Sequence, residues 1–222
     1  IFGIIGVSIL LVLSQPDLGT SIVLTSISLG MLFVAQFPLG YFLITLPIIA
    51  VGGLYSISHN PYQLKRITAF MNPWSDPLGK GFHAIQSLIA VGSGGLLGKG
   101  LGQSRQKFFY LPQQYTDYIF AIIAEEFGFI ATTLLLCVYF FFLYRCFLVA
   151  VRTETLYSKT LTIGLTLWIA FQAIINIGVT INILPSKGIT LPFISFGGTS
   201  LIMVMFAAGI LLNISRYRRP QP

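Results

Sequence analysis

The sequence predicts an all-α polytopic membrane protein, and three observations support this. The 222 residues are 55% hydrophobic and only 9% charged, with a mean hydropathy of +0.85, a composition typical of integral membrane proteins. Apolar runs of about the 20 residues that a membrane helix needs recur along the chain. The formal charge of +7 is spread over loops and the C-terminus, which indicates membrane topology and leaves no continuous basic stripe for nucleic acid.

We expect a single membrane domain with one partial span, five full spans and one long loop. Residues 1–13 are apolar but short, and the chain opens without Met or a charged segment, so we expect the C-terminal part of a longer protein rather than a signal peptide. The predicted full spans are 18–37, 41–57, 118–144, 161–184 and 189–214. The loop, 58–117, contains one apolar stretch at 82–91, which is too short to cross a bilayer and should lie at the interface or re-enter part way.

Basic residues in the short loops predict the orientation. Arg145, Arg152 and Lys159 lie between two spans, and further arginines follow the last span. Two crossings separate these groups, so both belong on the cytoplasmic side together with the C-terminus. The long loop, Asp117 and Lys187 then face the exterior. Because long loops cross membranes largely regardless of their charge, the basic balance of this loop points to an anionic ligand.

Asp117 is the main candidate catalytic residue, because it ends the polar loop immediately before an apolar span. At this border a carboxylate keeps its charge at modest cost and can reach groups held just above the hydrocarbon. Such a residue suits a base that acts on a lipid-linked substrate. An N-cap of the following helix is the structural alternative, since Asp at a helix start accepts from free backbone N–H groups.

On an ideal helix, small residues follow Asp117 along one face. Ala121, Ala124 and Gly128 fall within about 40° of its direction, and Glu125 about 80° away. The small strip indicates either close packing against another helix or a groove for a lipid tail. Glu125 lies about 12 Å along the axis, inside the span. It needs either a structural partner or a wet cavity with a function.

Several other polar features are candidate binding groups. Arg105 and Lys107 precede Asp117, and two cations near a carboxylate could hold a pyrophosphate, although cations at a membrane surface are common. The glycine-rich run 92–102 lacks the spacing of a phosphate-binding loop and favours a flexible loop. His59 and His83 have no partner at metal-ligand spacing. The stretch 184–200 carries two prolines, three glycines and five hydroxyls at membrane depth, which is typical of a helix with a broken start or simply a kinked one.

These residues resemble the SEDS proteins (shape, elongation, division and sporulation; FtsW, RodA and SpoVE), and within them the cell-division branch, FtsW, more than the elongation branch, RodA. The matching motifs run in family order over nearly the whole chain: Gln15-Pro16-Asp17-Leu18-Gly19-Thr20, Arg66-Ile67-Thr68-Ala69-Phe70, Asn72-Pro73-Trp74-Ser75-Asp76-Pro77, Gly100-Leu101-Gly102 through Gln106-Lys107, Tyr110-Leu111-Pro112 with Thr116-Asp117, Ala124-Glu125-Glu126-Phe127-Gly128, and Leu184-Pro185-Ser186-Lys187-Gly188 to Gly197-Gly198-Thr199-Ser200. One departure is that the family often has Glu and His where this chain has Gln113 and Tyr115.

The resemblance implies the C-terminal part of a ten-span glycosyltransferase of the bacterial cytoplasmic membrane, located at the division septum. Such enzymes polymerise lipid II into glycan strands beside a class B penicillin-binding protein and other division proteins. Carried onto this chain, Asp117 is the catalytic carboxylate in the acceptor step. The expected substrate-binding residues are Asp17, Arg105, Lys107, Glu125, Lys187, Ser195, Gly197, Gly198 and Thr199.

The expected chemistry needs one base and positive charge. Asp117 would take the proton of the acceptor sugar hydroxyl, and the lipid pyrophosphate would leave as an anion stabilised by Arg105, Lys107, Lys187 or a divalent cation, Mg²⁺ or Mn²⁺. Two rival functions stay open on the sequence. A lipid II flippase or transporter would fit the broken last helices and Asp17 at a helix end, and a non-catalytic division scaffold would not need Asp117.

Overall fold

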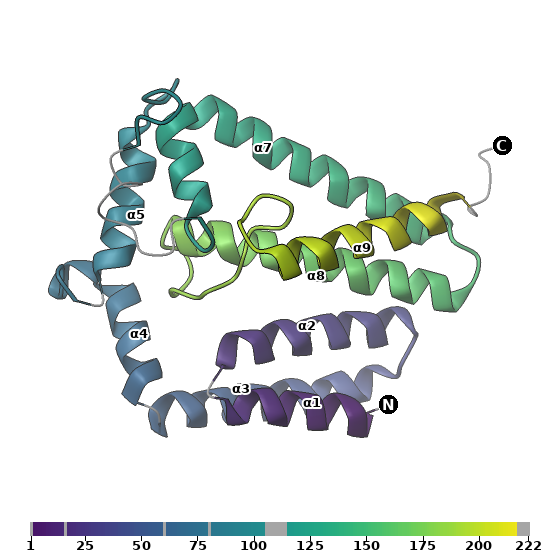
Figure 1. Cartoon of the computed structure of the whole chain (residues 1–222). Coiled ribbons are helices and arrows are strands. Elements are labelled where there is room, and N and C mark those ends of the chain that lie inside the picture. The colour runs from purple at the N-terminus through teal and green to yellow at the C-terminus, as the bar shows by residue number, and fades with distance from the viewer. Residues whose placement is uncertain (1, 16, 60, 80, 105–114, 217–222) are drawn as a thin grey trace. The chain divides into compact units, whose positions relative to one another are not determined.

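The computed structural model describes residues 2–15, 17–59, 61–79, 81–104 and 115–216, and within these ranges it is helical with no strands. The helices, in chain order, are α1 Phe2–Ser14, α2 Leu18–Val34, α3 Leu39–His59, α4 Pro61–Met71, α5 Phe82–Ser93, α7 Ile119–Arg152, α8 Leu156–Thr180 and α9 Gly198–Arg216, with a short 3₁₀ helix at Pro73–Ser75 (Figure 1). The expected all-α class is confirmed.

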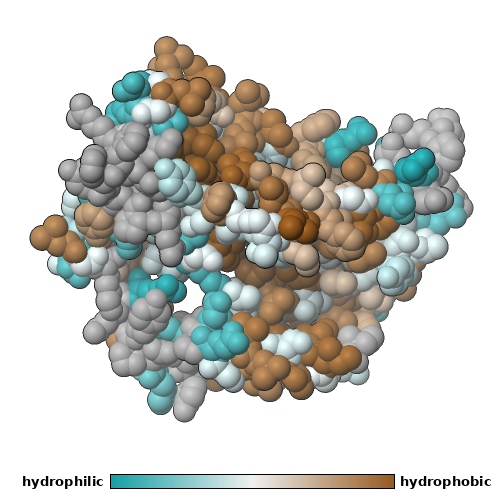
Figure 2. Space-filling model, viewed as in Figure 1, coloured by the Kyte–Doolittle hydropathy of each residue, from teal (hydrophilic) through white to brown (hydrophobic). Residues whose placement is uncertain are grey.

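Three of the described helices, α7, α8 and α9, are long and apolar enough to cross a membrane. The helices α2 and α3, with 17 and 21 residues, follow the predicted spans 18–37 and 41–57 closely. Large apolar side chains such as Leu134 and Phe140 of α7 face outward, and Figure 2 shows hydrophobic residues over much of the visible surface. Outward-facing apolar residues of this kind fit a polytopic protein with lipid as its surroundings.

The chain forms two compact units, and α7, α8 and α9 contribute to both. The first unit contains residues 1–61, 144–171 and 207–222. In it α1 packs on α2, and α2 packs on α3. Close approach of α2 to α8 depends on small residues, since a Cβ at Gly30 would overlap Leu167 and a Cβ at Gly164 would overlap Met31.

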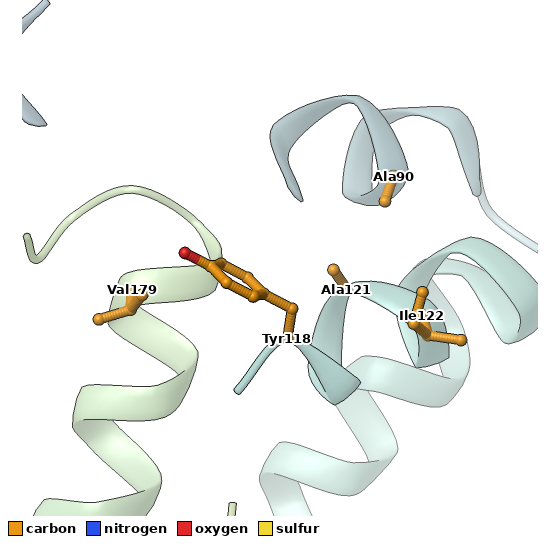
Figure 3. Packing of buried hydrophobic residues seen from close by; sticks show 5 residues of the cluster. All are labelled: Ala90, Tyr118, Ala121, Ile122 and Val179. Atoms are coloured by element: carbon orange, nitrogen blue, oxygen red, sulfur yellow. The ribbon is translucent and has the colours of Figure 1, made fainter. Parts of the chain in front are cut away.

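The second unit contains residues 62–143 and 172–206 and carries Asp117. Its core joins α5, α7 and α8 through Ala90, Tyr118, Ala121, Ile122 and Val179 (Figure 3). Ala121 faces Ala90 of α5 in this cluster, so the small-residue strip is used for close packing rather than for a lipid-tail groove. A second cluster joins α7 and α8 to Leu191, in the turn that follows α8.

The predicted loop 58–117 contains more helix than the sequence suggested. The short apolar helix expected at 82–91 is α5, but α4 was not predicted. Its signal was present in the sequence, because Pro61 is well suited to a first helical position and Leu64, Ile67 and Phe70 recur at helical spacing.

The predicted span 118–144 is bent near its start, at Gly128 (Figure 1). Gly128 has φ 76° and ψ −171°, a conformation open only to glycine. The bend admits residues 94–100 of the glycine-rich run, which are therefore fixed in place rather than forming the flexible loop that we expected. Four backbone hydrogen bonds hold this run on α7: Lys99 N to Glu125 O, Gly100 N to Glu126 O, Phe129 N to Gly95 O and Ile130 N to Leu96 O, at 2.9, 3.0, 2.9 and 3.2 Å.

The last two helices are shorter at one end than predicted. The helix α8 ends at Thr180 rather than 184, and α9 begins at Gly198 rather than 189. Residues 181–197 form a non-helical connection between α8 and α9, called here the turn after α8. In it the Pro192 carbonyl accepts a hydrogen bond from the Tyr139 hydroxyl of α7. The broken start expected for the last span is thus a long non-helical connection, and it borders the segment that carries Asp117.

Candidate functional site

A cavity of about 240 Å³ lies beside Asp117 in the second unit. The described residues that line it come from α4, from α5, from the segment before α7 and from the turn after α8: Arg66, His83, Asp117, Tyr118, Ser186, Lys187 and Gly188. The fold therefore brings Asp117 and Lys187, which the sequence predicted as site residues, to one cavity. It adds Arg66 and His83, which the sequence analysis did not select as site residues.

The Asp117 carboxylate is half-buried at the wall of this cavity. Burial raises the pKa of Asp117, because desolvation disfavours the charged form, while a hydrogen bond with the Thr116 side chain acts in the opposite direction. Among the described contacts the carboxylate makes no ion pair, and it does not cap α7 by accepting from that helix's first N–H groups. A carboxylate with a raised pKa is a stronger base than an ordinary Asp.

Positive charge and aromatic rings surround the carboxylate. Tyr118 has its pKa raised to about 12 by burial and by the Asp117 charge, and the Arg66 charge opposes this rise. The Arg66 charge thus acts on Tyr118, the residue next to Asp117. His83 stacks on Tyr118 with a centroid distance of 6.2 Å, and burial lowers the pKa of His83, so its imidazole is neutral at pH 7.

Gly188 lies close to the Asp117 carboxylate in the same cavity. A Cβ built on Gly188 would lie 3.1 Å from Asp117 Oδ2, a tighter contact than side chains normally make. The lack of a side chain at Gly188 therefore lets the turn after α8, with Lys187, approach the carboxylate.

Replacing Gly188 by Ala should misplace the carboxylate. The new methyl group must push Asp117 Oδ2 away by a few tenths of an ångström, and misplacements at a reacting centre cost roughly 10- to 100-fold in rate. If the reaction is the glycan polymerisation that the resemblance implies, we expect its kcat to fall by about tenfold or more while the melting temperature stays near that of the parent. The matched control is Gly92→Ala, since a Cβ at Gly92 meets nothing within 4 Å. Equal activity in the two variants would contradict the close contact.

Ser195 has a structural position rather than the substrate-facing one that we expected. Its side chain is buried, its hydroxyl donates to Thr116 O at 2.6 Å, and it accepts from Leu191 N at 2.7 Å. Both contacts are internal to the protein, and they fasten the turn after α8 to the segment before Asp117. Gly197, Gly198 and Thr199 lie at the start of α9 and are not among the described residues that line the cavity.

Glu125 also has a structural partner. It is fully buried, and its carboxylate pairs with Lys99 Nζ at 2.8 Å and accepts from Ser104 Oγ at 2.6 Å and Ser93 Oγ at 3.4 Å. These contacts come from the glycine-rich run and its flanks. Of the two interpretations left open by the sequence, structural pairing is the one that the geometry supports, and Glu125 does not line the Asp117 cavity.

Removing Lys99 should destabilise the second unit. In Lys99→Met the buried Glu125 carboxylate loses its ion pair with Lys99, and breaking a buried ion pair costs about 3 kcal/mol or more. The double variant Lys99→Met with Glu125→Gln removes the charge as well and should recover most of the loss. Denaturant-induced unfolding in detergent micelles measures both. A single variant as stable as its parent would show that the ion pair contributes nothing.

Of the remaining predicted site residues, Asp17 lies in the first unit, and Arg105 and Lys107 are outside the residues that the structure describes. Asp17 belongs to the first unit, where it caps α2 by accepting from Thr20 N at 3.1 Å and Thr20 Oγ1 at 2.6 Å. The capping contacts explain Asp17 without a substrate. Arg105 and Lys107 lie outside the described residues, so their role as pyrophosphate ligands stays a prediction.

The expected divalent cation has no protein-built site among the described residues, where no three His, Cys, Asp or Glu side chains come together. Asp117 is the one carboxylate among the described residues that line the cavity, and it is accompanied by the cations Arg66 and Lys187. This donor set does not fit a resident Mg²⁺ or Mn²⁺, which prefer several oxygen ligands.

Comparisons with known proteins all point to one protein family. Residues 1–220 match the model of the FtsW, RodA and SpoVE family, described as cell cycle protein. Stage V sporulation protein E of Bacillus subtilis is 49% identical over 98% of this chain and 59% of its own length. A protein of Coxiella burnetii named probable peptidoglycan glycosyltransferase FtsW is 45% identical over 96% of this chain and 58% of its own length. The chain thus spans somewhat under two thirds of these relatives.

Two solved structures share the fold. A peptidoglycan synthase complex that coordinates polymerization and crosslinking contains a chain that is 31% identical, with a TM-score of 0.74, over 99% of this chain and 60% of that one. An aspartate-to-alanine mutant of the rod shape determining protein RodA from Thermus thermophilus is 26% identical, with a TM-score of 0.61, over 96% of this chain and 55% of that one. On the match over residues 1–220 and this shared fold, the chain belongs to the FtsW, RodA and SpoVE family of cell cycle proteins.

Proposed function

We propose that the protein to which this chain belongs is a peptidoglycan glycosyltransferase that polymerises lipid II into glycan strands, with Asp117 as the general base. One observation carries the assignment of the base. Asp117 is the carboxylate that lines a cavity together with Lys187 and Arg66, and it is half-buried without an ion pair among the described residues. Family membership and relatives named probable peptidoglycan glycosyltransferase FtsW support the reaction class.

The proposed reaction is a single displacement at an anomeric carbon. Asp117 accepts the proton of the acceptor sugar hydroxyl as its oxygen forms a bond to the anomeric carbon of the growing chain. The bond from that carbon to the lipid pyrophosphate breaks, and the pyrophosphate leaves with the electron pair. Lys187 and Arg66 stabilise the negative charge on the leaving group. The proton then passes from Asp117 to water, so the site returns to its starting state.

One base is sufficient for this leaving group. A pyrophosphate leaves as an anion and needs no protein acid, unlike the sugar alcohol that leaves a glycosidase, which employs two carboxylates. This fits a cavity whose described lining holds one carboxylate and two cations. Attack on the face opposite the leaving group implies inversion at the anomeric carbon.

The setting of the reaction is part of the proposal. The cavity would face the exterior of the bacterial cytoplasmic membrane and the C-terminus the cytoplasm, as the distribution of Lys and Arg predicts. A class B penicillin-binding protein would crosslink the strands, which is supported by the likeness to a synthase complex that couples the two reactions. The chain matches relatives named stage V sporulation protein E and probable peptidoglycan glycosyltransferase FtsW, and a family described as cell cycle protein. We place its role in cell division at the septum, with other division proteins as partners.

The direct test uses the purified full-length protein with its penicillin-binding partner and lipid II in detergent. The expected result is polymer from the parent protein and none from Asp117→Asn. Polymer from both proteins would overturn the assignment of Asp117. Movement of lipid II across vesicle membranes that survives Asp117→Asn, without polymer, would favour the flippase. Division defects from surface variants alone would favour the scaffold.

A further inference from the structure

Hydrogen bonds to its backbone carbonyl groups hold the segment that carries Asp117, residues 115–117, in place. Three consecutive carbonyl groups each accept one hydrogen bond from the region around α8 and the turn that follows it. Tyr115 O accepts from Phe196 N at 2.8 Å, Thr116 O from Ser195 Oγ at 2.6 Å, and Asp117 O from Asn176 Nδ2 at 2.8 Å. The position of the carboxylate thus depends on these three donors.

Asn176 differs from the other two donors because it makes a second contact. The same Nδ2 donates to Ile189 O at 2.7 Å, so both hydrogens of the amide are used. Ile189 follows Lys187 and Gly188 directly, and Ile189 N donates to Lys187 O at 3.1 Å. One side chain on α8 therefore ties the backbone of Asp117 to the backbone of the turn that carries Lys187.

The surroundings of Asn176 indicate that these two contacts matter. The residue is 1% exposed near the C-terminal end of the apolar helix α8, and its Oδ1 finds no hydrogen-bond partner among the described residues. A buried acceptor without a partner is costly, and an apolar side chain of the same shape would avoid that cost while leaving the carbonyls of Asp117 and Ile189 without this donor. What an apolar side chain could not provide is the pair of N–H donors.

We propose that Asn176 is a positioning residue, which sets the separation between the Asp117 carboxylate and the turn that carries Lys187 by binding both backbones with one amide group. The inference rests on the proposed function and deepens it. The narrow spacing that Asn176 maintains is seen at Gly188, where a Cβ would lie 3.1 Å from Asp117 Oδ2. Without the tie, base and cation would no longer face the same reacting atoms.

The test compares Asn176→Asp and Asn176→Leu in the full-length protein with lipid II as substrate. Both variants keep the approximate shape and remove the two N–H donors. We expect kcat to fall by about 100-fold or more, as for a misplaced reacting group, and KM to change little. The acidic limb of the kcat profile should also move to lower pH, because a displaced Asp117 is better solvated and returns toward an ordinary pKa.

A control and a stability measurement separate positioning from general damage. Asn182→Asp makes the same chemical change at the end of the same region, where Nδ2 is 3.4 Å from Phe70 O, and should keep its activity. Asn176→Leu removes the unpartnered Oδ1 but also leaves the carbonyls of Asp117 and Ile189 without this donor, so we expect it to fold with a melting temperature at or moderately below that of its parent. The proposal is overturned if kcat per folded molecule is unchanged, if kcat falls in proportion to folded protein with the acidic limb unmoved, or if neither Asn176 variant folds. Activity in Asp117→Asn would instead refute the proposed function itself.

Discussion

Asp117→Asn should lose glycan polymerisation by roughly 10²- to 10⁴-fold, the contribution of a positioned general base. The amide has nearly the shape of the carboxylate and cannot accept the proton of the acceptor hydroxyl. The measurement is the rate of lipid II conversion by purified protein. Glu154→Gln is the control, because Glu154 is exposed between α7 and α8, and it should retain the parent rate.

The same substitution should not reduce stability. Burial raises the pKa of Asp117 in the folded protein above its value in the unfolded chain, so the folded state disfavours the ionised form at neutral pH. Asn removes this cost, and we expect an equal or higher melting temperature at pH 7. The difference should vanish at a pH below the ordinary Asp pKa, where both states carry a neutral acid. Loss of activity together with a clear loss of stability at pH 7 would show a structural role.

The pH dependence of the parent enzyme follows from the same shift. Asp117 must be ionised to act as a base, so activity should fall as the pH drops through its pKa in the folded protein. Because that pKa is raised, the acidic limb of kcat should lie above the range of an exposed Asp. A limb at the ordinary Asp value would contradict the burial of the carboxylate.

Gly128→Ala should lower the free energy of unfolding of the second unit strongly. The alanine would need φ 76° and ψ −171°, which costs about 1–3 kcal/mol by itself. Its Cβ would also lie 2.3 Å from Gly98 N and 2.7 Å from Leu96 O, and backbone atoms cannot rotate away. The glycine-rich run would have to leave α7 together with its four backbone hydrogen bonds. We expect a total cost of about 4 kcal/mol or more.

Thermal unfolding in detergent and limited proteolysis of residues 94–104 measure this effect. The variant should melt well below the parent, and the glycine-rich run should become sensitive to protease before the rest of the chain. Gly209→Ala is a suitable control within a helix, because a Cβ there meets nothing within 4 Å, and it should be neutral or slightly stabilising. Parent-like melting of Gly128→Ala would mean that α7 is not bent at this residue.

Hydropathy predicted the helical class because apolar runs report burial in lipid or protein directly. It could not predict the bend at Gly128, since the sequence there continues as apolar and the bend comes from a loop distant in the chain. The ends of α8 and α9 were missed for a similar reason. Residues 181–197 are apolar enough to read as helix, but Pro185, Pro192 and contacts such as Tyr139 to Pro192 favour a turn.

At the site, Asp117 was predicted because it ends a polar loop at the border of an apolar span and matches a motif of the family that the chain resembles. Arg66 and His83 were missed because they come from helices within the long loop, and no local pattern places them beside Asp117. Asn176 carried a usable signal, since a buried amide in an apolar span needs a reason. Glu125 and Ser195 were polar residues of the same kind, and only their contacts show that they stabilise the fold.

The docking of residues 115–117 through their carbonyl groups has a consequence for sequence variation. Tyr115 contributes its main chain to the contact with Phe196, whereas its ring is half exposed. Substitution at this position can therefore change charge and size without moving the base, so long as the peptide plane is kept. Tyr at 115, where the family that the chain resembles often has His, is compatible with this anchoring, whereas proline at 196, which lacks the N–H, would remove the contact.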